Sequence, residues 1–255
     1  MLGVDAFKRG ILSYVSSGLF ARLTTCEVRF EFDCGIRETA IERTTEIIPS
    51  SSSSQSDGNK FQDSVNMLVL INQTHGNVVR KHEFSLNGFF GGVYIGGTAD
   101  RIDFVVKNPD AALIQQREVP ARVIEYKTRR SQKVLDRDHT QCEVYGLLLD
   151  LNGFDVRGLR YTIVLAEPNC AEISCRKLLI PLYDRDKWTC GEDICHGENS
   201  MKFFEFGFDL ERGQQTVMDK LRFLRGEREA ISSRYSEVCG NCPYRTECPY
   251  SLAKK

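Results

Sequence analysis

The chain lacks the features that would place it in a membrane, on a secretory route or in a strongly basic class. No apolar run approaches the roughly 18 residues that a membrane-spanning helix requires. The opening "MLGVDAFKRG" has no apolar stretch of the secretory-signal kind, so we expect an intracellular protein. That means the cytoplasm, or the nucleus or a mitochondrion in a eukaryote. With 34 basic and 35 acidic residues the net charge is −1, so nucleic acid would have to be bound through local positive charge.

Cysteine is the exception, because the 255 residues include ten. Intracellular thiols stay reduced, which argues against a disulfide framework and leaves metal ligation or burial. Cys170 with Cys175, and Cys190 with Cys195, each enclose four residues, and His196 follows the second pair. A zinc site is conceivable there, but this spacing is not the usual chelating one, so we expect core or surface positions.

The hydrophobic patterns predict a single α/β domain spanning residues 1–255. Helical spacing alternates along the chain with strand-like runs, in the order helix, strands, helix, strands, helix. That order favours a mixed central sheet flanked by helices. Segment 26–35 is mixed in signal, and the serine-rich segment 49–58 is predicted to be a loop. The predicted helices are 6–22, 60–73, 134–151 and 214–230; the predicted strands are 78–86, 92–106, 121–128, 159–166 and 176–182.

Two predicted strands, "GGTADRIDF" (96–104) and "RVIEYKTRR" (122–130), carry charge where a buried strand should be apolar. Glu125 and Lys127 are two residues apart and therefore project from one face. Burying both is costly unless they are paired or bind a metal. Asp100 and Glu125 would supply oxygens to a hard cation, with Lys127 beside an attacking water. Asp103 is expected on the opposite face in a structural role, and a structural Glu125–Lys127 ion pair on a solvated edge strand is the alternative interpretation.

Asp100 followed by Glu125-Tyr126-Lys127 resembles the PD-(D/E)XK nuclease motif. Further along, "QCEVY" places Gln141 and Tyr145 one helical turn apart, which resembles the Q-x-x-x-Y motif of the RecB-like branch. The resemblance implies a restriction-endonuclease-like core and Mg²⁺ or Mn²⁺ as the cofactor. The metal ligands would be Asp100, Glu125 and the backbone carbonyl of Tyr126, and the implied catalytic residues are Asp100, Glu125, Lys127, Gln141 and Tyr145.

The tail "CGNCPYRTEC" holds Cys239, Cys242 and Cys248 in C-x2-C-x5-C spacing. Three thiols need a fourth partner to close a four-ligand site. RecB-like nucleases with an iron–sulfur cluster resemble this arrangement, with one distant cysteine near the N-terminus. The resemblance implies a [4Fe-4S] cluster that ties the two ends of the domain together. Cys26 is the preferred distant ligand and Cys34 the alternative, because spacing does not separate them.

Three stretches resemble the exonuclease V (defects in morphology) family in particular: "CEVRFEFDCGI", "GNVVRKHEFSLNGFFGGVYIGGTADRID" and "EYKTRR". The chain departs from that family in having Thr25 where the family has tryptophan. The family's early-helix histidine has no clear counterpart; Glu42 is the nearest candidate ligand. His75 and His82 are expected to be surface or structural residues.

A basic strip over residues 121–138 lies beside the predicted acidic site. It is expected to bind DNA phosphates without sequence preference, or else to form a solvated charged loop. We therefore expect a metal-dependent exonuclease acting on single-stranded DNA in DNA repair or genome maintenance. The alternatives are a CRISPR spacer-acquisition-type nuclease, an inactive DNA-binding module and a zinc-stabilised protein with structural charged strands. The strip contains Arg122, Lys127, Arg129, Arg130, Lys133 and Arg137, of which Arg129, Arg130 and Lys133 are the predicted DNA contacts.

Overall fold

The computed structural model describes residues 14–34, 74–75, 78–107, 117–129, 133–166 and 201–253. Within these ranges seven strands form one sheet in the order β2-β3-β4-β5-β6-β7, with β1 paired to β4 off this path. The β1–β4 and β5–β6 pairs are parallel and the others antiparallel, so the predicted mixed sheet is confirmed. The strands are β1 Tyr14–Ser16, β2 Thr74–His75, β3 Val78–Phe90, β4 Val93–Lys107, β5 Arg117–Thr128, β6 Arg160–Ala166 and β7 Met201–Gly207.

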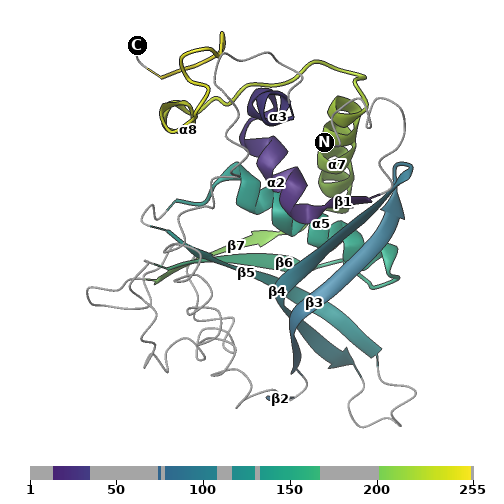
Figure 1. Ribbon diagram of the computed structural model, residues 1–255. Helices are drawn as coiled ribbons and strands as arrows, with labels where there is room; N and C mark the ends of the chain where they lie inside the picture. Colours follow the sequence, from purple (N-terminus) through teal and green to yellow (C-terminus); the bar gives the residue numbers. More distant parts are fainter. Residues whose placement is uncertain are drawn as a thin grey trace.

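Helices cover one face of this sheet. Figure 1 shows α2, α5 and α7 together above the strands, with α3 and α8 farther from the sheet. The predicted helix 134–151 is observed as α5, whose Leu147 and Leu148 are fully buried. No described helix is long and apolar enough to cross a membrane. The helices are α2 Ser17–Thr25, α3 Glu27–Asp33, α5 Asp136–Leu151, α7 Leu210–Leu224 and α8 Ser236–Gly240.

A tight turn joins the two longest strands. Phe90 pairs with Val93, so the turn consists of Gly91 and Gly92, at φ 56° and 82°. A two-residue hairpin of this hand needs positive φ at both positions, which glycine adopts without steric cost. Strand β3 therefore continues beyond the predicted end at residue 86 to Phe90, and β3 and β4 run far enough to carry charged residues at their middle.

The N-terminal helix prediction is confirmed from Ser17 onward and was wrong at residues 14–16, and residues 6–13 lie outside the described part. Residues 14–16 form β1, in which Tyr14 pairs with Tyr94 of β4, and the helix begins only at Ser17. Ser16 caps it, its Oγ accepting a hydrogen bond from the Leu19 N–H at 3.2 Å. The ambiguous segment 26–35 contains helix α3. Pairing with a distant strand thus outweighed the local helical spacing of Tyr14 and Val15.

The C-terminal half also differs from the prediction. Strand β7 was not predicted, and α7 runs over Leu210–Leu224 rather than 214–230. The Asp209 side chain caps its start, and Gly226 at φ 71° ends it in the left-handed conformation typical of helix C-termini. The predicted helix 60–73, loop 49–58 and strand 176–182 lie outside the described residues.

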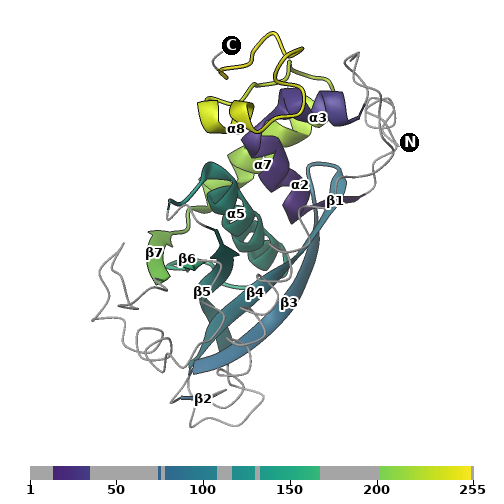
Figure 2. The same ribbon diagram turned by 60° about the vertical axis from the view of Figure 1, so that its left-hand side comes forward.

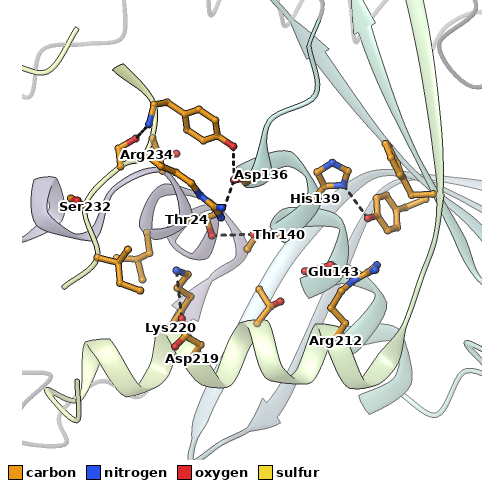
Figure 3. A pocket seen from close by; sticks show the side chains of 18 of the residues that line it. Thr24, Asp136, His139, Thr140, Glu143, Arg212, Asp219, Lys220, Ser232 and Arg234 are labelled. Atoms are coloured by element: carbon orange, nitrogen blue, oxygen red, sulfur yellow. Dashed lines mark hydrogen bonds and ion pairs between the residues drawn. The ribbon is translucent and has the colours of Figure 1, made fainter. Parts of the chain in front are cut away.

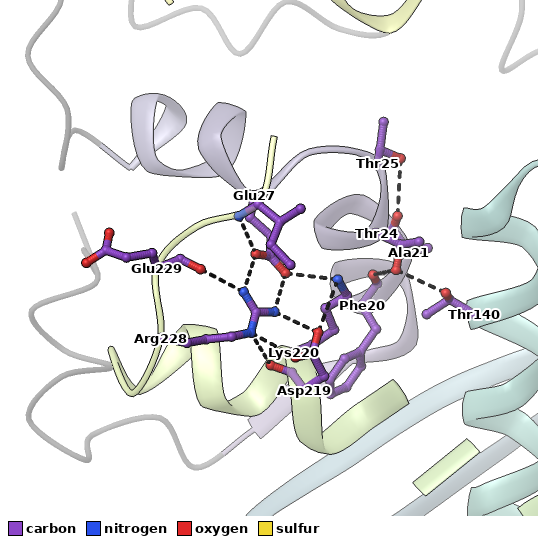
Figure 4. Close-up of polar contacts among 11 residues, drawn as sticks. Phe20, Ala21, Thr24, Thr25, Glu27, Thr140, Asp219, Lys220, Arg228 and Glu229 are labelled. Atoms are coloured by element: carbon purple, nitrogen blue, oxygen red, sulfur yellow. Dashed lines mark hydrogen bonds and ion pairs between the residues drawn. The ribbon is translucent and has the colours of Figure 1, made fainter. Parts of the chain in front are cut away.

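A buried ion network joins the N-terminal segment to the C-terminal one (Figure 4). The Glu27 side chain is fully buried and accepts hydrogen bonds from Arg228 Nη1 at 2.6 Å and Nη2 at 2.7 Å. Lys220 Nζ donates to it at 2.9 Å and the Ile231 N–H at 2.8 Å. The Glu27 N–H donates in turn to the Ile231 carbonyl at 3.0 Å. This network fixes the start of α3 against the chain that follows α7.

Candidate active site and cysteine cavity

The predicted acidic pair lies where β4 and β5 part. Their ladder ends at Arg101 paired with Ile124, and the same register continued by one step places Asp100 opposite Glu125. The ladder does not continue to this pair, and Asp100 Oδ2 accepts a hydrogen bond from the Tyr126 backbone N–H at 2.7 Å. Asp100 is thus anchored to the β5 backbone, close enough to Glu125 for its charge to raise the pKa of that carboxyl.

Glu125 is a buried carboxylate with one oxygen free. Its side chain is 3% exposed, and its Oε1 accepts from Lys127 Nζ at 2.5 Å. Its Oε2 is buried and has no hydrogen-bond partner. Burial, and then the nearby Asp100 charge, raise the pKa of Glu125 from 4.5 to about 8, against the attraction of Lys127. A buried acceptor without a partner is expected to be costly, which makes Oε2 a natural position for a cation.

Lys127 begins a chain of hydrogen bonds that crosses from β5 through α5 to β4. Lys127 Nζ donates to Gln141 Oε1 at 3.0 Å, and Gln141 Nε2 donates to the Tyr145 hydroxyl at 2.8 Å. That hydroxyl donates to the Thr98 carbonyl at 2.7 Å. Burial lowers the pKa of Lys127, but the Glu125 charge more than offsets this and the net shift is upward, so the ammonium form is kept. The structure thus joins Lys127, Gln141 and Tyr145 in one network.

Tyr145 is 1% exposed, so its ring packs in the core and offers no face on which a base could stack. Burial raises the pKa of its hydroxyl, which keeps it protonated as the donor to Thr98. Sequence reasoning missed the Thr98 carbonyl, because a backbone acceptor leaves no trace in residue type. It also missed Asp138, which is 1% exposed and accepts from the Leu135 N–H at the start of α5. An acidic residue at the third helical position is the sequence signal that could have found Asp138.

Asp103 has the structural role expected of it. Arg101 Nε and Nη2 donate to its two carboxylate oxygens at 2.6 Å and 2.8 Å, and both residues are buried. Arg80 Nε lies 3.9 Å from Asp103 Oδ1. His82, which pairs with Arg101 across the ladder, is half-buried and has its pKa lowered to about 4, first by burial and then by Arg101. Arg101 and Asp103 interact with the Tyr126 side chain, which alternates with Glu125 and Lys127 along β5 and so projects from the other face, and this favours the structural role expected of His82.

The predicted basic strip is broken up in the structure. Arg122 is buried beside Glu205, with its Nε 3.3 Å from that carboxylate, and does not belong to the strip. The Arg129 guanidinium is engaged by the buried carboxylate of Asp138. Lys133 and Arg137 are exposed, as a phosphate contact requires, and Arg130 lies outside the described residues. Arg122 was counted in the strip but not among the predicted DNA contacts, and its burial in the sheet removes it from the strip.

The four preferred cysteines meet in one small cavity. Cys26, Cys239, Cys242 and Cys248 all line it, whereas Cys34 does not. Figures 1 and 2 show α8 and the C-terminal segment beside α3, and Phe32 of α3 stacks on Tyr244 with 4.8 Å between ring centroids. All six cysteines in the described part of the chain are free thiols. The fold therefore brings together four thiols that are more than two hundred residues apart at the extremes.

Among the described residues, neither the acidic pair nor the four cysteines form a complete metal-binding site. Among the described residues no three histidine, cysteine, aspartate or glutamate side chains are arranged to hold a metal ion. Glu42, the distant cysteine pairs and His196 lie outside the described residues, as does the side chain of His75.

A second cavity, of about 710 Å³, lies on the other side of α5 and was not expected (Figure 3). Its charged groups face one another: Arg212 Nε donates to Glu143 Oε1 at 2.7 Å, and Arg234 lies 3.7 Å from Asp136. None of the predicted site residues lines it. Because its charges are mutually paired, it is not the acidic site that the sequence predicted.

The chain is similar to one known protein family and to solved structures. The family model described as the PD-(D/E)XK nuclease superfamily matches residues 59–249. A search of curated proteins finds no match. The solved structure of the protein SSO0001 is similar with 17% identity over 94% of this chain and 88% of the other, at a TM-score of 0.47. A protein of Eubacterium rectale named as a candidate exonuclease is similar with 12% identity over 99% of this chain and 92% of the other, at 0.44.

Proposed function

The chain belongs to the PD-(D/E)XK nuclease superfamily, and from that premise we propose that it is a metal-dependent exonuclease that hydrolyses single-stranded DNA. The observation that carries the proposal is the free, buried Oε2 of Glu125, next to Asp100 and beside the Lys127 ammonium. This is an acidic site with a cation beside it, as phosphodiester hydrolysis requires. The preference for single strands and a role in DNA repair follow from the resemblance to exonuclease V.

The residues present fit a hard divalent cation, Mg²⁺ or Mn²⁺. Asp100 and Glu125 would hold it with their carboxylate oxygens, the donor type that such ions prefer, and the Tyr126 carbonyl is the proposed third ligand. When bound, the cation would supply positive charge at the phosphate and favour ionisation of the attacking water. It would also satisfy Oε2 and remove the reason for the raised pKa of Glu125.

The protein's own groups have separate tasks in this proposal. Lys127 remains charged and would steady the negative charge that develops on the phosphate, or orient the attacking water. Gln141 fixes the direction of the ammonium through its Oε1. Tyr145 fixes Gln141, because its hydroxyl accepts from the Gln141 amide and donates to the Thr98 carbonyl. Positioning through such a chain matters because small displacements of a catalytic group reduce rate strongly.

Asp100→Ala is expected to reduce Mg²⁺-dependent degradation of end-labelled single-stranded DNA by about a thousandfold or more, because it removes a cation ligand. Degradation should also stop when the wild-type protein is treated with EDTA, and return with Mg²⁺ or Mn²⁺. Asp150→Asn, near the far end of α5, is the matched control and should retain activity. Absence of degradation by the wild-type protein, or equal degradation by Asp100→Ala, would defeat the nuclease proposal.

We also propose that Cys26, Cys239, Cys242 and Cys248 hold a [4Fe-4S] cluster of structural use. The four free thiols around one cavity are the donor set that such a cluster takes. The fold favours Cys26 over Cys34 as the distant ligand, because only Cys26 lines the cavity. A cluster there would bridge the same two segments that the Glu27 network joins.

Protein purified anaerobically is expected to be brown and to contain iron and sulfide, measured by absorption and by metal analysis. Cys26→Ser should lose the colour, whereas Cys34→Ser should keep it. The loss should also lower the free energy of unfolding by roughly 4–5 kcal/mol, because the cluster closes a very long loop. Colourless protein that holds zinc instead would refute the cluster assignment.

A further inference from the structure

The alternation of side chains along β4 reverses at Asp100. Successive residues of a strand point to opposite faces, so core residues should be separated by two positions. On β4, Ile95 and Ala99 belong to the core, and the next core residues are Ile102 and Phe104. The step from Ala99 to Ile102 is three residues, so the strand changes face between them.

Strand β3 reverses at the same level. Val79 packs against the core, and the core-facing positions then become Phe84 and Leu86, again with a change from odd to even numbers. Lys81, two positions after Val79, also lies on the core face, because its Nζ is 4.7 Å from the centroid of the Phe104 ring. The pairing of β3 with β4 stays in register across the reversal, since both strands change face together.

Glu83 is the residue at which β3 makes this change. His82 pairs with Arg101 and Phe84 with Ala99, which places Glu83 opposite Asp100 at the one level that the ladder omits. Glu83 has φ 46° and, in the part of the chain that the structure describes, is the only residue other than glycine with positive φ. The left-handed region is unfavourable for a residue with a Cβ, and such positions persist where the surrounding structure requires them.

We propose that Glu83 is a positioning residue whose left-handed backbone turns Asp100 toward β5. The proposal rests on the nuclease function proposed above, and it concerns the backbone of Glu83 rather than its carboxylate. If the two strands did not change face at this level, Asp100 could keep its present direction only if the apolar residues on one half of the hairpin turned away from the core. The Glu83 side chain itself is exposed, so its charge and its backbone can be tested separately.

Three substitutions of Glu83 separate these contributions. Valine is branched at Cβ and disfavours positive φ, so Glu83→Val should displace Asp100 and lower Mg²⁺-dependent activity by about a hundredfold, while raising the Mg²⁺ concentration for half-maximal rate. Glycine accepts the conformation and glutamine keeps it without the charge, so both variants should stay within about threefold of the wild type. Ser85→Thr, on the same exposed side of β3, adds a branched side chain but keeps the hydroxyl that bonds Thr98, so it is the control and should have no effect.

A second measurement is independent of activity. The Tyr126 N–H donates to Asp100, so its hydrogen exchange reports whether Asp100 is in place, with Asp100→Ala as the unprotected reference. Protection should be lost in Glu83→Val and retained in Glu83→Gly. Thermal melting should place Glu83→Gly above Glu83→Ala, the reverse of the order in a regular strand.

The outcomes are distinct. An inactive wild-type protein would count against the proposed function, whereas an active wild type equalled by Glu83→Val would overturn the positioning role. Equal loss in Glu83→Gln would show that the carboxylate acts, and would also overturn it. If Glu83→Val does not fold, the glycine and alanine variants decide the outcome. The proposal then fails if Glu83→Gly melts at a lower temperature than Glu83→Ala, or if the Tyr126 N–H of Glu83→Gly loses its protection from hydrogen exchange.

Discussion

Glu125→Gln is expected to give a metal-free protein that is more stable than the wild type at pH 7 and has no nuclease activity. Activity should fall by about a thousandfold or more, because the amide is a poor ligand for a hard cation. Stability should rise, because burial and Asp100 oppose the charge of Glu125 and raise its pKa from 4.5 to about 8. Glutamine has nearly the same shape, and its Oε1 can still accept from Lys127.

The sign of the pH dependence follows from this raised pKa. Below pH 4.5 the carboxyl is protonated in the folded and the unfolded state, and it costs nothing. Between 4.5 and about 8 the unfolded state releases the proton and the folded state keeps it, so wild-type stability falls as pH rises. Each unit is worth about 1.4 kcal/mol, and pH 7 lies about 2.5 units above 4.5, so we expect a gain of about 3 kcal/mol at pH 7, in which the attraction of Lys127 is already included.

Urea denaturation in EDTA at pH 5, 7 and 9 measures this difference. The wild type should lose stability over that series relative to Glu125→Gln, and Glu118→Gln, an accessible carboxylate on the same strand, should follow the wild type. Added Mg²⁺ should stabilise the wild type and leave Glu125→Gln unchanged. A glutamine variant less stable than the wild type at pH 7 would mean that Glu125 contributes to folding as an ion pair.

The site could be predicted from the sequence as far as its chemistry is local. Glu125 and Lys127 share a face because they are two apart, and Gln141 and Tyr145 because they are four apart, and the structure places all four in one connected set. The direction of Asp100 could not be predicted this way, because it depends on a reversal in two strands at once. Strand patterns assume a constant period of two, which fails at that level.

Strands β1 and β7 and the bounds of α7 were missed for different reasons. The first strand follows the parallel pairing of Tyr14 with Tyr94, which no local pattern contains. Strand β7, "MKFFEFG", has apolar residues on both faces and lacks clear alternation. For α7 the signals were present, in the capping Asp209 and the terminating Gly226, but apolar spacing alone placed the helix about four residues late.

The choice between Cys26 and Cys34 shows the same limit. The two cysteines are eight positions apart at the two ends of α3, so spacing treats them alike. In the fold, the N-terminal end of α3 is held against the segment after α7 through Glu27 and Ile231, and the cavity forms on that side. A tertiary contact of the neighbouring residue therefore decides which thiol is available.

Glu27→Ala is expected to lower the free energy of unfolding by about 3–5 kcal/mol, because it leaves Arg228 and Lys220 as poorly exposed cations without their main partner. The Arg228 and Lys220 side chains are 20% and 13% exposed, and that of Glu27 is fully buried. The substitution also removes the acceptor of the Ile231 N–H. Urea denaturation of the metal-free protein gives the value directly.

Asp219→Ala is the matched control within the same network. Asp219 also accepts from Arg228, at 2.8 Å, but its side chain is 46% exposed, so water can replace it and the expected loss is below about 1 kcal/mol. Joint replacement of Glu27 and Arg228 by methionine should recover part of the loss, since it removes the uncompensated charge as well as the pair. A loss in Glu27→Ala no larger than in Asp219→Ala would show that the network contributes little.

The position of Glu27 connects this stability to the proposed cluster. Cys26 precedes it directly, and Ile231 lies a few residues before Cys239, so the network holds both sides of the cysteine cavity without any metal. Glu27→Ala should therefore release iron to a chelator faster than the wild type, even at temperatures where it remains folded. Equal release rates in the two folded proteins would mean that the thiols are positioned by the cluster itself and not by the ion network.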